Sequence, residues 1–167
     1  MQSTLKGRAF KFGDAISTDL IIAGKYAHLR SNLPELAKHV MEDASPNFVK
    51  QVQPGDFIVG GSNFGLGSSR EHAPLVIKMA GVGAVLAKSF ARIFFRNAIN
   101  QGLPLLICDT DKVSDGDWLE VSLEEGIITN LTKNEKYSFT RISPVMLSIL
   151  NEGGLIPYIN KHGDFKI

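Results

Sequence analysis

Most of the residues that could do chemistry in this chain lie in one glycine-rich stretch, residues 60–74. Its centre holds two adjacent hydroxyls, Ser68 and Ser69, followed by Arg70 and then by an acid and an imidazole, Glu71 and His72. The planar guanidinium fork matches a carboxylate or a phosphate. Hydroxyls beside such a fork add hydrogen-bond donors and acceptors for the same ligand. The stretch therefore predicts binding of an anion.

The elements around this stretch would position it at the end of a strand. An apolar run at 57–59 precedes the glycines, and a helical pattern follows over 73–80. A strand, a tight loop and a helix N-terminus in succession leave backbone N–H groups and the positive end of the helix dipole facing a ligand. We expect Ser68 or Ser69 at or near the N-cap of this helix.

The loop glycines strengthen the functional interpretation against a plain capping loop. Glycine in a loop loses more conformational entropy on folding than any other residue, so its use favours a close approach of the backbone to a ligand. The four glycines concerned are Gly60, Gly61, Gly65 and Gly67. Simple helix capping by a serine remains compatible with this interpretation.

Three common kinds of site do not fit the same residues. A Walker phosphate loop is excluded because no Gly-Lys-Ser/Thr follows at its spacing. A dinucleotide fingerprint fits poorly, since Arg70 stands where the third glycine belongs. The elbow of a serine hydrolase is absent, because Ser69 is followed by Arg70 and Glu71 rather than by a residue and a glycine.

The rest of the chain predicts an α/β fold. Short apolar runs that alternate with helical patterns indicate right-handed crossovers and a mostly parallel central sheet. The later segments have the spacing of C-terminal hairpins, and a final helix is expected with Ser143 as N-cap and Pro144 after it. The expected strands are 5–12, 57–59, 84–87, 103–108, 117–121, 126–131 and 136–139, and the expected helices are 34–41, 73–80, 90–100 and 143–150.

Length, charge and hydropathy limit the function classes. The chain has 167 residues, and residues 1–167 are expected to form one domain. A formal net charge of +1 with interspersed acids and bases favours neither nucleic acid nor an anionic membrane as partner. No apolar run reaches the ~20 residues that span a bilayer, and the N-terminus lacks a signal-peptide core. We expect a cytoplasmic protein, or an organelle protein without its targeting segment.

The metal-binding residue types are sparse. Cys108 is the single cysteine and follows an apolar run, so we expect an inert core thiol. An iron–sulfur cluster takes about three or four cysteine ligands, which this chain cannot supply. The four histidines show no metal-ligand spacing, so we expect no cofactor or metal bound by this chain alone.

Three motifs in order along the chain resemble the swivelling domain of the aconitase superfamily. The first is similar to that family's Thr-Asp-x-Ile element, the second to its active-site serine signature, and the third to the segment downstream of that signature. They are Thr18-Asp19-Leu20-Ile21, Gly67-Ser68-Ser69-Arg70-Glu71-His72-Ala73, and Lys88-Ser89-Phe90-Ala91-Arg92-Ile93-Phe94 with Arg96-Asn97 and Gly102-Leu103-Pro104 after it. The short length resembles the small subunits of 3-isopropylmalate dehydratase or homoaconitase.

This resemblance implies a fold, a partner and a reaction. The fold is a three-layer β/β/α swivelling domain. The partner is a large subunit that carries a 4Fe-4S cluster, in a heterodimer or heterotetramer. The reaction is removal and readdition of water on a small hydroxy-di- or tricarboxylate.

The resemblance also assigns roles to single residues. Ser68 would be the base, as an alkoxide whose pKa is lowered by surrounding donors. Ser69 and Arg70 would bind a substrate carboxylate, and Arg30 is a second candidate clamp. Asp19 would pair with a histidine of the partner and help to position the acid–base groups; its alternative is a loop turn or a cap for the Leu20 segment. His72, Arg92 and Arg96 are given no catalytic role.

The substrate is left open by the loop that follows Asp19. An isopropyl tail needs apolar walls and an extra carboxylate needs a cation, and this loop offers both Leu29 and Arg30. Isopropylmalate is the first choice, with homoaconitase or a dimethylmalate dehydratase as alternatives. A non-catalytic anion-binding regulatory module is the alternative of another class.

Overall fold

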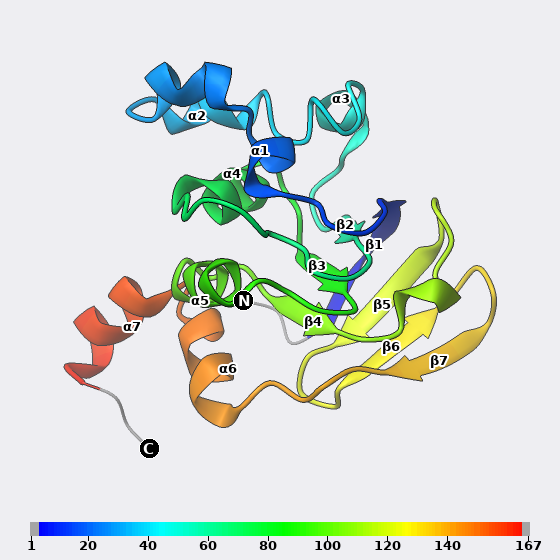
Figure 1. Cartoon of the computed structure of the whole chain (residues 1–167). Coiled ribbons are helices and arrows are strands. Elements are labelled where there is room, and N and C mark those ends of the chain that lie inside the picture. The colour runs from blue at the N-terminus through cyan, green and yellow to red at the C-terminus, as the bar shows by residue number, and fades with distance from the viewer. Residues whose placement is uncertain (1–3, 165–167) are drawn as a thin grey trace.

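The computed structural model describes residues 4–164, which fold around one seven-stranded sheet in the order β4-β3-β2-β1-β5-β6-β7 (Figure 1). The first four strands in this order pair in parallel, and β1 then pairs antiparallel with β5, as do β5 with β6 and β6 with β7. The strands are β1 (Thr4–Lys11), β2 (Phe57–Val59), β3 (Ala84–Ala87), β4 (Leu105–Ile107), β5 (Trp118–Ser122), β6 (Ile127–Asn130) and β7 (Glu135–Ser138).

The helices connect the parallel strands and cover them. Helix α4 leads from β2 to β3 and helix α5 from β3 to β4, as expected from the alternating pattern. The helices are α1 (Thr18–Ile21), α2 (Leu33–Ala37), α3 (Phe48–Gln51), α4 (His72–Met79), α5 (Arg92–Asn100), α6 (Pro144–Asn151) and α7 (Leu155–His162), with the 3-10 helices η1 (Gly24–Leu29) and η2 (Thr110–Lys112).

Two apolar cores on opposite faces of the parallel strands define the layers. On one face, Ile58 and Val85 pack with buried residues of the helices, such as Leu36 and Val76. On the other face, side chains of the same strands pack with buried residues of β5 and β6, such as Leu119. Alternate residues of a strand point to opposite faces, which is why neighbours in one strand serve different cores. The expected β/β/α fold is confirmed, and Figure 1 shows the helices α1–α4 on the side away from β5–β7.

The sheet curls so that its two ends approach one another. Just after β7, the Thr140 N–H donates to the Ile107 carbonyl at the end of β4, at 2.9 Å. Because β4 and β7 are the outer strands of the sheet order, this bond partly closes the sheet. Such closure protects backbone groups that an open edge would expose.

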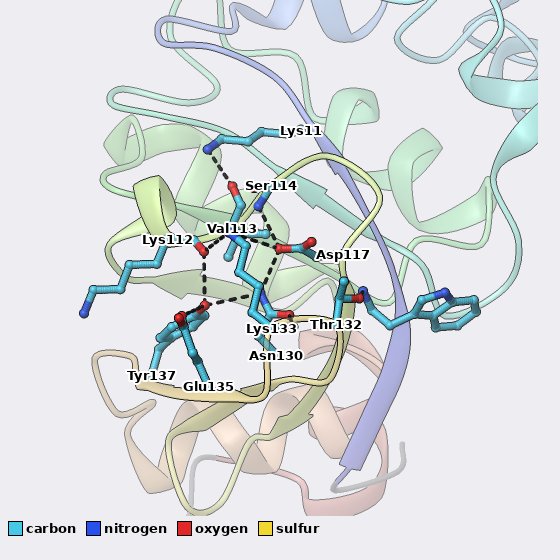
Figure 2. A network of polar contacts seen from close by, with 11 residues as sticks. Lys11, Lys112, Val113, Ser114, Asp117, Asn130, Thr132, Lys133, Glu135 and Tyr137 are labelled. Carbon is cyan, nitrogen blue, oxygen red and sulfur yellow. Dashed lines mark hydrogen bonds and ion pairs between the residues drawn. The ribbon is translucent and has the colours of Figure 1, made fainter.

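A buried polar network fixes the far end of the antiparallel hairpins (Figure 2). Asn130 is fully buried, and its amide donates to Asp117 Oδ2 at 2.8 Å and to the Tyr137 hydroxyl at 3.2 Å. Its carbonyl accepts the Lys133 N–H at 3.0 Å. Burial acts to raise the pKa of Asp117, but the hydrogen bonds from Ser114 and Asn130 outweigh it and hold that pKa below its usual value. The network is internally satisfied and ties β5, β6 and β7 together.

The N-terminal helices differ from the sequence prediction. A helix over 34–41 was expected, whereas α2 ends at Ala37. The physical reason is a tertiary contact, because Met41 has a φ of 58° and its N–H donates to the Ile21 carbonyl at 2.8 Å. Helices α1, α3 and α7 were not predicted. The final helix α6 does begin as expected, with the Ser143 hydroxyl accepting the Met146 N–H at 3.3 Å.

Within residues 4–164, none of the helices is both long and apolar enough to cross a membrane.

Candidate active site

The three motif segments meet beyond the carboxyl ends of β1, β2 and β3. Short bridges join Ser17 to Leu66 and Phe64 to Phe90, so the serine loop runs between the other two segments. The Thr18 N–H donates to the Leu66 carbonyl at 2.8 Å, and the Ala91 N–H donates to the Phe64 carbonyl at 2.9 Å. This is the edge at which open α/β sheets bind ligands.

The loop glycines are explained mainly by packing within the chain. A Cβ at Gly61 would overlap the Asp14 carboxylate, and a Cβ at Gly65, where φ is +84°, would overlap the Phe94 ring. At Gly60 a Cβ would come within 2.6 Å of the Phe64 ring. The expectation that these glycines serve approach to a ligand is therefore wrong for Gly60 and Gly61, and Gly65 and Gly67 line a cavity.

The predicted capping of α4 by Ser68 or Ser69 is also wrong. The helix begins at His72 with Glu71 as N-cap, and no side chain caps it. The loop is held upstream instead, where the Thr18 hydroxyl donates to the Ser68 carbonyl at 3.1 Å. Both serine side chains are consequently exposed and free of a capping role.

Arg70 is the centre of the polar contacts at this site. Its Nε donates to the Ser68 Oγ at 3.2 Å, and its Nη1 donates to the Ile22 carbonyl at 2.7 Å. Its Nη2 forms an ion pair with Asp19 Oδ1 at 2.8 Å. The guanidinium thus joins two predicted site residues that are far apart in the sequence, Asp19 and Ser68.

The Asp19 carboxylate does not cap its own helix. The Ser17 hydroxyl caps α1 by accepting the Leu20 N–H at 3.2 Å. Asp19 remains 69% exposed while it pairs with Arg70. The alternative role of Asp19 as a cap is therefore excluded, and one face of its carboxylate remains available to a further donor.

Two cavities flank the Arg70 side chain. The larger, about 590 Å³, is lined by Arg30, Ser69, Arg70 and His72 among others. The smaller, about 190 Å³, contains Ser68 together with Ser69 and Arg70. The structure thus brings Asp19, Ser68 and Ser69 together around the Arg70 guanidinium, and Arg30 lines the larger cavity with Arg70. A groove of about 510 Å³ near Arg8 lies away from these motifs.

Two arginines, Arg30 and Arg70, line the larger cavity together with one acid, Glu71. Burial, and then the charges of Arg70 and Arg30, lower the pKa of the His72 imidazole below its usual value. The two guanidinium groups disfavour the protonated, cationic form of His72, and for the same reason they favour an anion bound near them. The site therefore suits a carboxylate chemically.

Several further residues line the site that the sequence interpretation left aside. His72 and Tyr26 face the larger cavity, and Arg92 and Asn97 face the smaller one. Arg92 and His72 lie inside the motifs, so their position next to the serines could have been suspected. Tyr26 belongs to the loop after Asp19 that was expected to meet the substrate, but the sequence assigned no role to its side chain.

The thiol and the acidic groups offer no metal site in the part of the chain that the structure describes. Within residues 4–164, no three His, Cys, Asp or Glu side chains gather as metal ligands. Burial, helped by the nearby Asp109 charge, raises the pKa of Cys108 to about 12. That thiol is therefore a poor ligand and a poor nucleophile at neutral pH.

Comparison with known proteins identifies the family. The model of the aconitase C-terminal domain matches residues 14–109, which include all three motifs. The solved structure of a 3-isopropylmalate dehydratase from Methanocaldococcus jannaschii has a TM-score of 0.92 and 47% identity, and the match covers 96% of this chain and 95% of that one.

The curated relatives match over nearly the whole chain. A 3-isopropylmalate dehydratase small subunit 2 from Archaeoglobus fulgidus is 66% identical over 96% of this chain and 98% of its own length. A small subunit 1 from Thermotoga maritima is 57% identical with the same coverage. An isopropylmalate/citramalate isomerase small subunit from Methanocaldococcus jannaschii is 53% identical over 96% of each chain. The resemblance seen in the motifs is confirmed, and the chain belongs to the aconitase C-terminal domain family, among the 3-isopropylmalate dehydratase small subunits.

Proposed function

We propose that this chain is the small subunit of a two-chain hydro-lyase that interconverts 2- and 3-isopropylmalate in leucine biosynthesis. The reaction removes water from a hydroxy-dicarboxylate and adds it back with the hydroxyl on the neighbouring carbon. The observation that carries the proposal is the contact of one guanidinium, Arg70, with both Asp19 and Ser68 at the wall of a cavity that Arg30 also lines. The names of the relatives supply the substrate.

Ser68 is the proposed base. As an alkoxide it would take the proton from the substrate carbon and return a proton when water adds back. A serine holds this role only where a positive donor stabilises the oxyanion. The Arg70 Nε at 3.2 Å from the Ser68 Oγ is such a donor. The base and its stabilising charge therefore belong to the same loop.

Ser69, Arg70 and Arg30 are the proposed contacts of the substrate carboxylates. They line one cavity of about 590 Å³, and Arg30 and Arg70 act together on the His72 pKa. A dicarboxylate has two anionic ends, which suits two separated guanidinium groups. Asp19 holds the Arg70 fork in place through the 2.8 Å ion pair. Pairing of Asp19 with a histidine of the partner remains part of the proposal.

The name small subunit in the relatives implies a large-subunit partner. We propose that this partner binds the 4Fe-4S cluster, in a heterodimer or heterotetramer, because this chain has a single cysteine with a strongly raised pKa. When bound, the cluster supplies a Lewis acid for the substrate hydroxyl. The proposal also retains two sequence expectations: that residues 1–167 act as one domain, and that the enzyme works in the cytoplasm.

The test is a hydro-lyase assay with this chain alone, with a cluster-loaded large subunit alone, and with the mixture. The substrates are 3-isopropylmalate, citramalate, homoaconitate and dimethylmalate. We expect turnover only in the mixture and the highest kcat/KM for isopropylmalate. Preference for homoaconitate or dimethylmalate would replace the substrate but keep the reaction. Absence of a complex would favour an anion-binding regulatory module instead.

A further inference from the structure

The wall of the larger cavity includes a segment that is only weakly held by burial, since Tyr26 and Leu29 are partly buried against the core. Helix η1 has no buried residue and its N-cap, Ala23, makes no side-chain capping bond. Its backbone bonds are local, from the Tyr26 N–H to Ala23 and from the Arg30 N–H to Ala27. Local bonds shape the segment but do not fix it against the rest of the molecule. Arg30 directly follows this segment, so the place of Arg30 depends on the tertiary contacts of the segment, of which one is polar.

That contact is a cluster of three side chains, Tyr26, His39 and Glu42, here called the phenol clamp. The Tyr26 hydroxyl donates to Glu42 Oε1 at 3.1 Å. The His39 Nδ1 lies 2.7 Å from Glu42 Oε2, so it is the donor to that oxygen. The Tyr26 and His39 rings are stacked, with centroids 3.8 Å apart and planes inclined by 15°. Each carboxylate oxygen therefore receives one of two stacked donors.

The electrostatics of the phenol clamp agree with these roles. The hydrogen bond from His39, and then that from Tyr26, lower the pKa of Glu42. The hydrogen bond to Glu42 raises the pKa of Tyr26, so the phenol keeps its proton and remains a donor. The Lys25 ammonium lies 5.3 Å from the centroid of the Tyr26 ring and adds a cation–π contact on the same segment.

The phenol clamp connects the cavity wall to a separate part of the fold. Tyr26 lines the cavity together with Arg30 and Arg70, whereas His39 and Glu42 follow helix α2 and do not line it. Helix α2 is anchored in the core, since Leu36 and Ala37 are buried. The anchored stretch thus holds the exposed segment through the polar contacts of Tyr26, and Leu29 adds apolar packing against the core.

We propose that Glu42 and His39 are positioning residues that act through Tyr26 and hold Arg30 where it binds one end of the substrate. This rests on the proposed function, because Arg30 is taken there as a carboxylate contact. The substrate enters a wall that is already formed, so less ordering is required at binding. Loss of the phenol clamp should therefore raise KM more than it lowers kcat.

The first experiment measures steady-state kinetics of the complex with Glu42→Gln in this chain. The amide keeps the size of the side chain but cannot accept a hydrogen bond on both of its ends. We expect KM for isopropylmalate to rise about five- to tenfold with kcat within about twofold, as for loss of one exposed charge-assisted bond. The control is Glu35→Gln, which removes a carboxylate that pairs with Lys38 at 2.7 Å, and its KM should not change.

The second experiment separates positioning from a general structural effect. Glu42→Gln is repeated in an Arg30→Ala background. If the clamp acts through Arg30, the second substitution adds no further rise in KM. If Glu42 has a structural role that does not act through Arg30, the rise in KM of the double variant is the product of the rises in the two single variants. Equal rises in the two backgrounds would overturn the proposal.

The third measurement does not need activity. Amide hydrogen exchange in this chain should become several-fold faster at Tyr26 and Arg30 in both Glu42→Gln and Tyr26→Phe, with the strands of the sheet unchanged. If exchange in the η1 segment is the same in these variants as in wild type, the proposal that the phenol clamp holds this segment is wrong, whatever the kinetic results. If the wild-type complex does not turn over isopropylmalate, the proposed function fails while exchange still decides the clamp.

Discussion

Replacing Arg70 with lysine tests the centre of the site, since lysine keeps the charge and removes the fork. The three partners of Arg70 lie in different directions: the Ser68 Oγ at 3.2 Å, the Ile22 carbonyl at 2.7 Å and Asp19 Oδ1 at 2.8 Å. A lysine ammonium is a single point on a flexible stem, so it can retain about one of them. Arg70→Lys therefore deletes about two contacts without removing the positive charge.

The expected loss of stability is small and the loss of activity is large. Asp19 is 69% exposed and Ser68 lies at the surface, so screening limits the loss of unfolding free energy to about 1–2 kcal/mol. During turnover the substrate and partner exclude water, and the bond to the Ser68 oxyanion is worth about 1.5–3 kcal/mol. This corresponds to a fall of about 10- to 150-fold in kcat. Loss of one carboxylate contact should raise KM about tenfold.

The assay combines kinetics of the complex with urea unfolding of this chain. A weaker positive donor beside Ser68 makes its alkoxide harder to form, so the acid limb of the pH–rate profile should move to higher pH. The matched control is Arg96→Lys on α5, an exposed arginine outside both cavities, with kcat within twofold of wild type. A folded, complexed Arg70→Lys enzyme with kcat within about threefold of wild type and an unmoved pH profile would refute the assignment of Ser68 and Arg70.

Three further predictions concern the base, the cavity and the fold. Ser68→Ala should abolish turnover while complex formation and the urea midpoint stay as in wild type; a tenth of normal activity would exclude Ser68 as base. Because the pKa of His72 is lowered in the folded chain, the unfolded chain binds more protons than the folded chain once the pH falls below about 6.5. The free energy of unfolding should therefore decrease between pH 7 and pH 5, and this decrease should be smaller in His72→Asn. Asn130→Leu leaves the buried Asp117 carboxylate without its amide donor and should cost about 2–4 kcal/mol of unfolding free energy in urea, whereas a cost below ~0.5 kcal/mol would deny the network a structural role.

The hydrophobic pattern was sufficient to predict the inner parallel strands because β2 and β3 are buried on both faces. Both strands are wholly apolar; Gly60 follows β2 and Gly83 precedes β3. The later hairpins and α6 carry their own turn and capping signals, such as Ser143 before Pro144. These elements are local in origin, so the sequence alone is enough to place them within a few residues.

The parts that escaped prediction are held by contacts between distant residues. Helix α2 stops early because Met41 bonds to Ile21, and the start of α4 is delayed by a loop tied to Thr18. The motifs named Ser68, Arg70 and Asp19, but they did not show that the Arg70 guanidinium contacts both Ser68 and the distant Asp19. The pairing of Tyr26 with Glu42 has no periodic signal either. Tertiary geometry, and not residue type, decides these contacts.

The openness of the site implies how it must work. Ser68, Ser69 and Arg30 are exposed and Asp19 is 69% exposed, so in the free chain water reaches every proposed catalytic group. A serine alkoxide in contact with bulk water would be protonated at neutral pH. In that high dielectric the Arg70 Nε, 3.2 Å from the Ser68 Oγ, stabilises the alkoxide only weakly. The same contact becomes several times stronger once a partner covers the cavity and water leaves. We therefore expect the chain on its own to be inactive, and its proposed chemistry to depend on the partner surface that covers Arg70.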